Sequence, residues 1–208
     1  MEEHDQDALR AQRHEVERLL GLNLLRLQAY ERLVKAIVAS HKGTASLDPS
    51  GKMRVSPAIN PDGQTLGMLV NQMLGSVVVP DGLSGSPVDD LLPSGDSPAF
   101  GFAFQVSFPT DSHTAIENGL RALVSLRNDL VDDFLDRHDL GHAEGCRLAQ
   151  TALTEATETI DRHLGDLKQW ARDSVEAKRT LSAIIESAAF RDRVVRGAVD
   201  LSGQVDCR

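Results

Sequence analysis

The feature that most constrains this chain is a continuous helical pattern over about residues 5–41. Apolar residues recur there at alternating spacings of four and three, which places them on one face of a helix. The positions on this face are Val16, Leu20, Asn23, Leu27, Tyr30, Val34 and Ile37. The pattern predicts a long helix that packs against other helices, ends at Gly43, and uses the polar Asn23 to set the register of packing.

Two further long segments have the same helical spacing. Residues 111–137 carry Ile116, Leu120, Leu123, Leu130 and Phe134 on one face. Residues 144–187 carry Leu153, Ala156, Ile160, His163, Leu167 and Trp170. Residues 65–78 predict a shorter apolar helix, and His163 is expected to be a packed core or interface histidine rather than a catalytic one. Long helices joined by loops favour an all-α, antiparallel helical bundle.

Gly, Pro and Ser are concentrated in residues 43–64 and 80–98, which predict two loops. In residues 99–108, phenylalanines alternate with smaller residues, a period typical of an extended or β arm. Pairing with the same arm of a second chain would give that strand a partner. We predict a single helical domain over 1–200 and a polar tail over 201–208. A homodimer is expected, because helices of this length leave apolar surface beyond one core.

Composition limits the ligands. The formal net charge is -9, and an acidic chain is repelled by bulk nucleic acid, so DNA is not expected and any RNA contact must be made locally by a few arginines. Cys146 and Cys207 do not form a CxxC pair, which disfavours a zinc or redox site, and no cofactor is expected. The acidic beginning of the chain is unlike a signal peptide, and no apolar run is long enough for a membrane span, so the cytoplasm is expected.

The most informative segment is Arg127 and the residues after it. Arg127 stands between Leu123 and Leu130, where the helical pattern calls for an apolar side chain. A charge placed there is costly unless it is paired or functional. Asn128 and Asp132 are four residues apart, on one helix face. We therefore predict a cluster of guanidinium, amide and carboxylate groups; the simpler alternative is a buried salt bridge between Arg127 and a carboxylate of a neighbouring helix.

The segment Arg127-Asn128-Asp129-Leu130-Val131-Asp132 resembles the Arg-x(4–6)-His motif of the HEPN superfamily, which often begins Arg-Asn. It is also similar to a bacterial helical domain that accompanies OST-HTH/LOTUS modules. The resemblance implies a dimeric helical bundle and a metal-independent endoribonuclease in RNA processing, defence or a toxin–antitoxin pair. It implies that Arg127 contacts phosphate and that Asn128 orients it. The histidine positions hold Asp132 and Asp133, which implies a weak or degenerate nuclease.

Two other functions remain open. The first is a magnesium-dependent phosphohydrolase that uses a stripe of carboxylates, since such groups suit Mg²⁺ with a phosphate ligand. The stripe consists of Asp129, Asp132, Asp133 and Asp136. It could equally be a solvated acidic face, which Arg137 would partly compensate. The second is a non-enzymatic, dimeric scaffold that binds a protein partner.

Overall fold

A computed structural model of the chain describes residues 2–47, 53–82 and 99–190. The chain divides into two compact units, Met1–Ala171 and Arg172–Arg208. The boundary falls within the predicted 1–200 domain. The first unit contains nearly all the described elements, and the described part of the second consists mainly of the end of one long helix. The predicted tail at 201–208, and residues 83–98 of the second predicted loop, lie outside the described residues.

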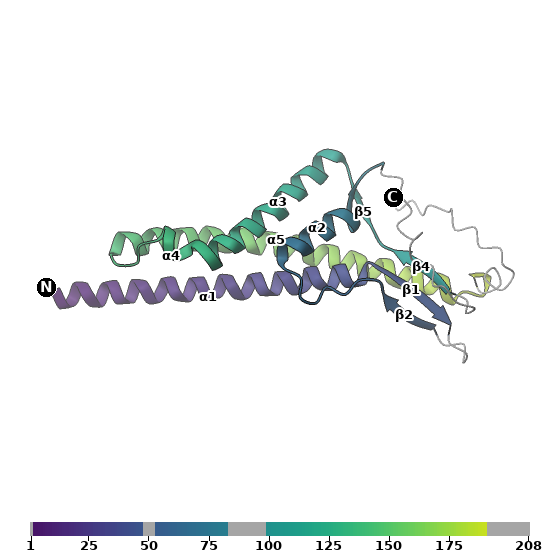
Figure 1. The fold of residues 1–208 in the computed structure, drawn as a ribbon, viewed down its shortest axis with the longest axis horizontal. Coiled ribbons are helices and arrows are strands. Elements are labelled where there is room, and N and C mark those ends of the chain that lie inside the picture. Colours follow the sequence, from purple (N-terminus) through teal and green to yellow (C-terminus); the bar gives the residue numbers. More distant parts are fainter. Residues whose placement is uncertain (1, 48–52, 83–98, 191–208) are drawn as a thin grey trace. The chain divides into compact units, whose positions relative to one another are not determined.

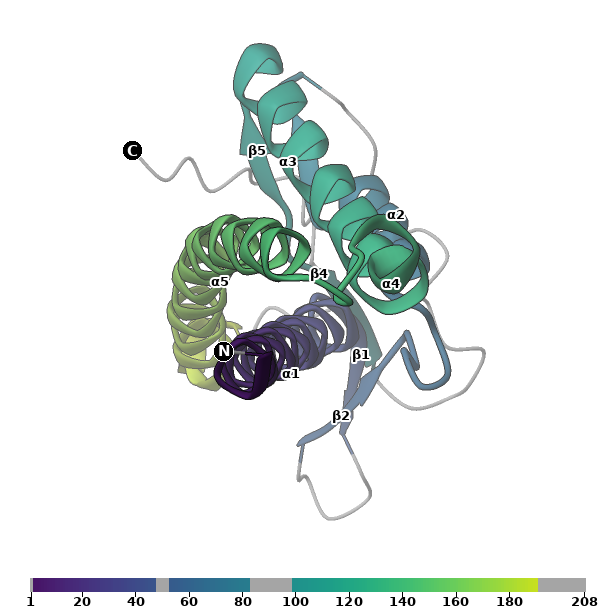
Figure 2. The same ribbon diagram turned by 90° about the vertical axis from the view of Figure 1, so that its left-hand side faces the viewer.

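The first unit is built on three long helices. Helix α1 (Glu2–Ser40) runs out, α3 (Thr110–Asn128) returns, and α5 (Ala143–Glu186) runs in the direction of α1 (Figures 1 and 2). Sequential long helices are therefore antiparallel, and α1 and α5 are parallel neighbours. A short helix, α2 (Leu66–Ser76), packs against α1 and α3. The predicted helical bundle is confirmed.

The predicted apolar faces form the core. On α1, Val16, Leu27, Tyr30, Val34 and Ile37 are buried. On α5, Leu153, Ala156, Ile160 and Leu167 are buried. Helix α2 adds Leu66, Leu69, Val70 and Met73. Branched and linear aliphatic side chains thus fill the space between helices, as a chain with 4% aromatic residues requires. No described helix is both long and apolar enough to cross a membrane.

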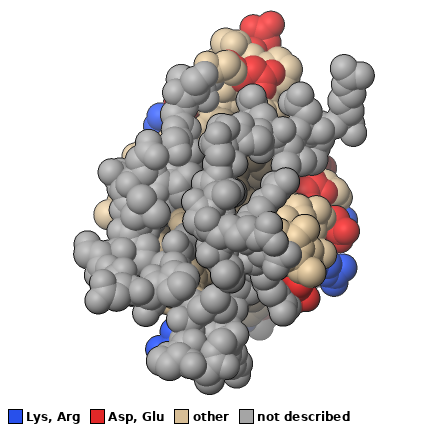
Figure 3. Space-filling model, turned by 90° about the vertical axis from the view of Figure 1, so that its right-hand side faces the viewer, with Lys and Arg blue, Asp and Glu red and all other residues tan. Residues whose placement is uncertain are grey.

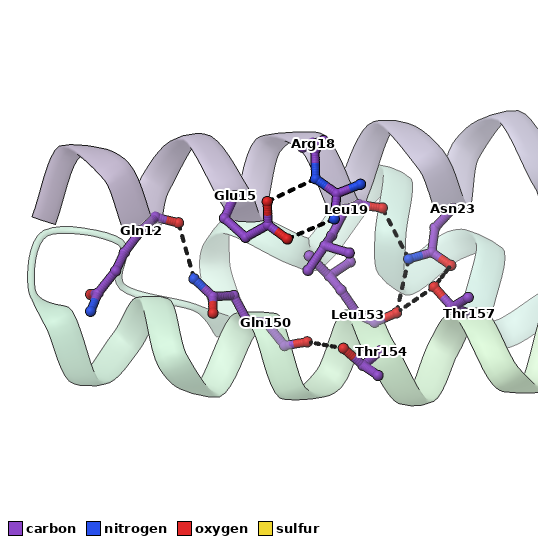
Figure 4. Close-up of polar contacts among 9 residues, drawn as sticks. All are labelled: Gln12, Glu15, Arg18, Leu19, Asn23, Gln150, Leu153, Thr154 and Thr157. Atoms are coloured by element: carbon purple, nitrogen blue, oxygen red, sulfur yellow. Dashed lines mark hydrogen bonds and ion pairs between the residues drawn. The ribbon is translucent and has the colours of Figure 1, made fainter. Parts of the chain in front are cut away.

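Asn23 sets the packing of α1 on α5, as the sequence predicts. Its side chain is fully buried, and its Nδ2 donates to the carbonyl of Leu19 at 3.1 Å and to that of Leu153 at 2.9 Å. Its Oδ1 accepts a hydrogen bond from Thr157 at 3.0 Å (Figure 4). Because a shift along the helix would leave these groups unsatisfied, the amide selects one alignment of the two helices.

The predicted helix at 111–137 is interrupted. Helix α3 passes into a π-helical turn, η2 (Asp129–Asp133), and then into α4 (Phe134–Arg137). Leu130 and Phe134 are buried as predicted. Between Leu123 and Leu130 the apolar face passes through Leu126, which packs partly buried against the core. Arg127 therefore lies beside the apolar face and not in it, which corrects its predicted place.

Residues 43–64 were predicted as a loop, and the structure has two strands there. Strand β1 (Lys42–Leu47) pairs antiparallel with β2 (Met53–Pro57) and with β4 (Ala99–Ala103), in the order β2-β1-β4. Helix α1 ends at Ser40, so Gly43 lies in β1 and does not end the helix. A Cβ on Gly43 would lie 2.7 Å from the Ser56 carbonyl oxygen and 2.9 Å from Cζ of Phe102. The glycine is needed for close packing in a sheet.

The extended arm predicted at 99–108 is confirmed as β4 and β5 (Val106–Phe108). Both strands find partners in the same chain: β4 pairs with β1, and β5 pairs in parallel with β3 (Val78–Pro80). The expectation that a second chain would complete this arm is therefore wrong. The sequence did not indicate β1 because it is built of small residues rather than the β-branched and aromatic residues typical of strands.

Candidate functional site

The predicted cluster around Arg127 is present at the end of α3. Its Nη1 donates to Oδ1 of Asn128 at 3.3 Å and lies 3.5 Å from Oδ2 of Asp132. The side chain of Arg127 is 39% exposed, and that of Asp132 is 60% exposed. The guanidinium is thus half-covered and open to a ligand. The alternative that pairs Arg127 with a carboxylate on a neighbouring helix is wrong, because its ionic partner lies in the same helical segment.

The π-helical turn explains why Arg127 reaches Asp132. In an α-helix, residues five apart point in different directions, because one turn takes 3.6 residues. A π turn hydrogen-bonds residues five apart and brings them onto one side. Asp132 is five residues after Arg127 and lies within η2. Asn128 and Asp132 were expected on one face as residues i and i+4. With the wider turn, each of them contacts the guanidinium of Arg127. Such turns are frequent at functional sites.

Asp133, the other residue at a histidine position of the motif, lies apart from this cluster. Its carboxylate is 3.5 Å from Nη2 of Arg137, which also pairs with Asp129 at 2.8 Å. The predicted compensation of the acidic stripe by Arg137 is confirmed. The two adjacent aspartates thus have different partners, Asp132 the guanidinium of Arg127 and Asp133 that of Arg137.

The carboxylate stripe does not gather into a metal site. Across residues 2–47, 53–82 and 99–190, no three His, Cys, Asp or Glu side chains are grouped so that they could hold a metal ion. Two of the four aspartates in the stripe, Asp129 and Asp133, already share the guanidinium of Arg137. This arrangement offers a divalent cation little uncompensated negative charge at these two positions.

A pocket of about 350 Å³ adjoins the Arg127 cluster, between α2 and α3. Its lining residues are Gly67, Val70 and Asn71 from α2 and Arg121, Val124, Ser125 and Asn128 from α3. Asn128 belongs to both the pocket and the Arg127 cluster. Sequence reasoning missed the pocket because it depends on how α2 packs against α3. The available signal was the polar series Arg121, Ser125 and Asn128, spaced at four and three residues on one helix face.

Within the pocket, polar groups of the two helices contact each other. Nη1 of Arg121 donates to Oδ1 of Asn71 at 3.2 Å, and the Arg121 guanidinium pairs with Glu117 at 2.8 Å. The side chains of Val70 and Val124 add apolar surface beside these groups. The lining of this open pocket thus combines two valine side chains with hydrogen-bonding groups.

His163 is half-buried on α5, where α5 meets α3. A Cβ on Gly119 would lie 2.8 Å from Cε1 of His163, so the absence of a side chain on Gly119 makes room for the imidazole. Burial lowers the pKa of His163, nearby Arg162 lowers it further, and Asp166 opposes both. This position agrees with the prediction of a packed histidine.

Two arginines of α3, Arg121 and Arg127, lie near the pocket. On the face drawn in Figure 3, the Lys and Arg side chains among the coloured residues are separated from one another. Arg121 and Arg127, by contrast, lie within two turns of α3 and reach the same pocket region through Asn71 and Asn128.

Comparisons with protein-family models, with curated proteins and with solved structures found no match to this chain.

Proposed function

We propose that this chain is an RNA-acting, HEPN-like domain that binds phosphate through Arg127 and is a degenerate or weak nuclease. One observation carries the proposal: the half-exposed guanidinium of Arg127 is held by Asn128 and Asp132 across a π-helical turn. A guanidinium is always charged and presents paired N–H donors that match two phosphate oxygens. The resemblance of residues 127–132 to the HEPN motif supports the same role.

Asn128 and Asp132 have different roles in this proposal. The Oδ1 of Asn128 accepts from Nη1 of Arg127 and so orients the guanidinium. Asp132 lies 3.5 Å from the same nitrogen, a long and exposed ion pair that contributes little stability. A phosphate can displace this carboxylate, but the two anions repel each other. The carboxylate therefore weakens RNA binding without abolishing it.

The same residues explain why cleavage would be slow. Cleavage by attack of the RNA 2′-hydroxyl on the adjacent phosphate needs a group that accepts the hydroxyl proton and a group that donates a proton to the departing 5′-oxygen. Aspartate is ionised near neutral pH, so it has no proton to donate to the leaving oxygen. Asp133 is turned toward Arg137 and away from the Arg127 cluster. In this proposal Arg127 and Asn128 bind the phosphate, and the cluster lacks a group that donates a proton to the leaving oxygen.

RNA binding is tested with fluorescently labelled single-stranded RNA and anisotropy. Arg127→Ala should weaken binding by about tenfold or more, because it removes a charge-assisted phosphate contact worth roughly 1.5–3 kcal/mol. Asp132→Asn should strengthen binding, because it removes a negative charge. Arg18→Ala is the matched control, since Arg18 is also an exposed arginine paired within its own helix, to Glu15. If Arg127→Ala and Arg18→Ala weaken binding equally, the proposal fails.

Cleavage is tested by restoring histidine at both positions. The double variant Asp132→His, Asp133→His should cleave RNA faster than the unchanged chain, and EDTA should not affect the rate. Hydrolysis of nucleoside triphosphates by the unchanged chain that EDTA abolishes would instead favour the magnesium-dependent alternative. The absence of cleavage in the double variant, with RNA binding retained, would leave a binding role and contradict the proposed nuclease ancestry.

A non-enzymatic, dimeric scaffold is the second candidate, and a different observation favours it. Val131 and Leu135 are large apolar residues with exposures of 48% and 72%, and they flank Asp132 and Asp133 on η2 and α4. Exposed apolar side chains grouped in this way are typical of interaction surfaces. We propose a second copy of the chain as the occupant. Sedimentation equilibrium should show a dimer that Leu135→Glu dissociates; a monomeric unchanged chain would contradict it.

A further inference from the structure

Helix α1 carries a second series of regularly spaced residues, which does not belong to its buried face. The spacing alternates between four and three, as it does on the buried face, so these residues also form one stripe along the helix. The apolar members are Ala11, Leu22, Leu25, Ala29 and Ala36. The charged members are Glu15, Arg18 and Arg32. We call these positions the outer seam of α1.

The outer seam is open to solvent at its centre. Leu25 is 64% exposed, Leu22 is half-buried, and the three alanines of the seam are exposed. A Cβ on Gly21, one turn before Leu25, would meet no atom within 4 Å, so packing within this chain does not require a glycine there. Helix α3 and the first-unit part of α5 lie together on one side of α1, which leaves α1 at an edge of the first unit (Figures 1 and 2).

The charges of the outer seam are placed symmetrically about its two leucines. Glu15 is seven residues before Leu22, and Arg32 is seven residues after Leu25. Arg32 is exposed and has no ionic partner among residues 2–47, 53–82 and 99–190. The carboxylate of Glu15 bonds to Arg18 at 2.6 Å and 2.7 Å, but its side chain is 43% exposed and its oxygens can accept from a second cation.

We infer that the outer seam pairs with the outer seam of a second copy of this chain, with the two α1 helices antiparallel. A twofold axis between Leu22 and Leu25 would bring each of these leucines against the other leucine of the second copy. The same axis would bring Glu15 opposite Arg32. It would also place Ala11 opposite Ala36 and Arg18 opposite Ala29, a large side chain against a small one. Every position of the seam would thus meet a complementary one, as a twofold interface requires.

Other alignments of the two helices are less favourable. A parallel pair in register would place like charges opposite each other at Glu15, Arg18 and Arg32. In an antiparallel pair, a shift of one heptad would place Leu22 opposite either Arg18 or Arg32. Because charged residues within a seam select orientation and register at some cost in stability, the sequence of the outer seam favours one arrangement.

This pairing does not depend on RNA binding, and its surface shares no residue with the one that contains Val131 and Leu135. Sedimentation equilibrium of the unchanged chain should show a dimer. Leu25→Glu should raise its dissociation constant at least about hundredfold, because each dimer loses two buried leucines. Leu148→Glu is the matched control, since Leu148 is 50% exposed on α5, outside the seam, and should leave the dimer unchanged. Circular dichroism should show that both variants keep their helices.

Charge reversal tests the orientation. Glu15→Arg or Arg32→Glu alone would place like charges opposite each other and should weaken the dimer roughly tenfold. Both changes in one chain restore opposite charges between chains and should recover most of the affinity. The two positions are roughly 25 Å apart along one helix, too far for contact within a chain. The double variant also leaves the Glu15–Arg18 pair broken, so recovery reports contact between chains.

The outcomes distinguish this surface from the others. Dissociation by Leu25→Glu, with Leu135→Glu still dimeric, supports the outer seam. A monomeric unchanged chain overturns it, as does a dimer that only Leu135→Glu dissociates. A double charge variant no tighter than the single variants overturns the antiparallel alignment. The effect of Arg127→Ala on RNA binding is measured separately, so the proposed function can stand or fail without this interface.

Discussion

Asn23 and Asn128 are two asparagines in long helices, and their surroundings differ completely. Asn23 is fully buried and bonds across to Leu153 and Thr157 on α5 (Figure 4). Asn128 is exposed at the end of α3 and bonds to its own neighbour, Arg127. The first amide connects two helices that are far apart in the sequence. The second arranges a side chain at the surface of one helix.

The difference shows how to distinguish a structural polar group from a ligand-binding one. All hydrogen-bonding groups of a buried amide must be satisfied by the protein, so the amide determines which neighbour fits. An exposed amide can exchange its partners with water, so its loss changes stability little. The Asn23 contact therefore accounts for helix alignment. A role for Asn128 must be sought in what binds beside it.

The largest expected effect is on stability at Asn23. Asn23→Ala should lower the free energy of unfolding by roughly 2–3 kcal/mol, because it deletes the buried hydrogen bonds of the amide to Leu19, Leu153 and Thr157. Asn128→Ala should change it by less than about 0.5 kcal/mol, as at other exposed positions. Urea titration of both variants measures the contrast. Equal losses would mean that the two amides do not differ in role.

A smaller effect is expected at Thr157. Thr157→Val removes the hydroxyl that donates to the buried Oδ1 of Asn23 and should destabilise the protein by about 1 kcal/mol. Thr154→Val is the matched control, because the Thr154 hydroxyl is exposed and bonds only to the carbonyl of Gln150 in its own helix. Thermal unfolding should separate the two. An equal decrease in Tm would show that loss of a helical hydroxyl, not the buried contact, is responsible.

His163 on α5, which packs beside Gly119 of α3, should make the stability of the protein depend on pH. Burial lowers the pKa of His163, so near neutrality the unfolded chain binds a proton more readily than the folded chain. The resulting stability is complete above the ordinary histidine pKa of about 6.5 and falls as pH decreases through it. Tm measured between about pH 7.5 and 5.5 should fall less in His163→Asn than in the unchanged chain. Parallel curves would contradict this.

The smallest expected effect on stability is at Asp132. Its ion pair with Arg127 is long and exposed, so Asp132→Asn should change the free energy of unfolding by less than about 0.5 kcal/mol. The same variant should measurably strengthen RNA binding. An effect on binding without an effect on stability is the reverse of the expectation for Asn23. A large loss of stability would show that the ion pair supports the fold and would weaken its assignment to a ligand site.

Much of the helical architecture was determined by the sequence alone. Helical spacing of apolar residues requires a helix to bury one face, so the long helices and most of their core residues could be predicted. Asn23 was recognisable because a polar residue in an apolar series must find partners. The cluster at residues 127–132 was predicted on the same ground, although Leu126, not Arg127, occupies the apolar face between Leu123 and Leu130.

The tertiary structure decided what no local pattern encodes. Strand β1 exists because β2 and β4 satisfy its backbone and Phe102 packs against Gly43, not because its residues favour strands. The π turn brings Asp132 to Arg127, a contact five residues apart that α-helical spacing does not predict, whereas the pairing of Asp133 with Arg137 follows from i,i+4 spacing. The pocket arises where α2 packs on α3. Periodicity specifies the face a helix must bury, but contacts between distant segments decide which polar groups meet.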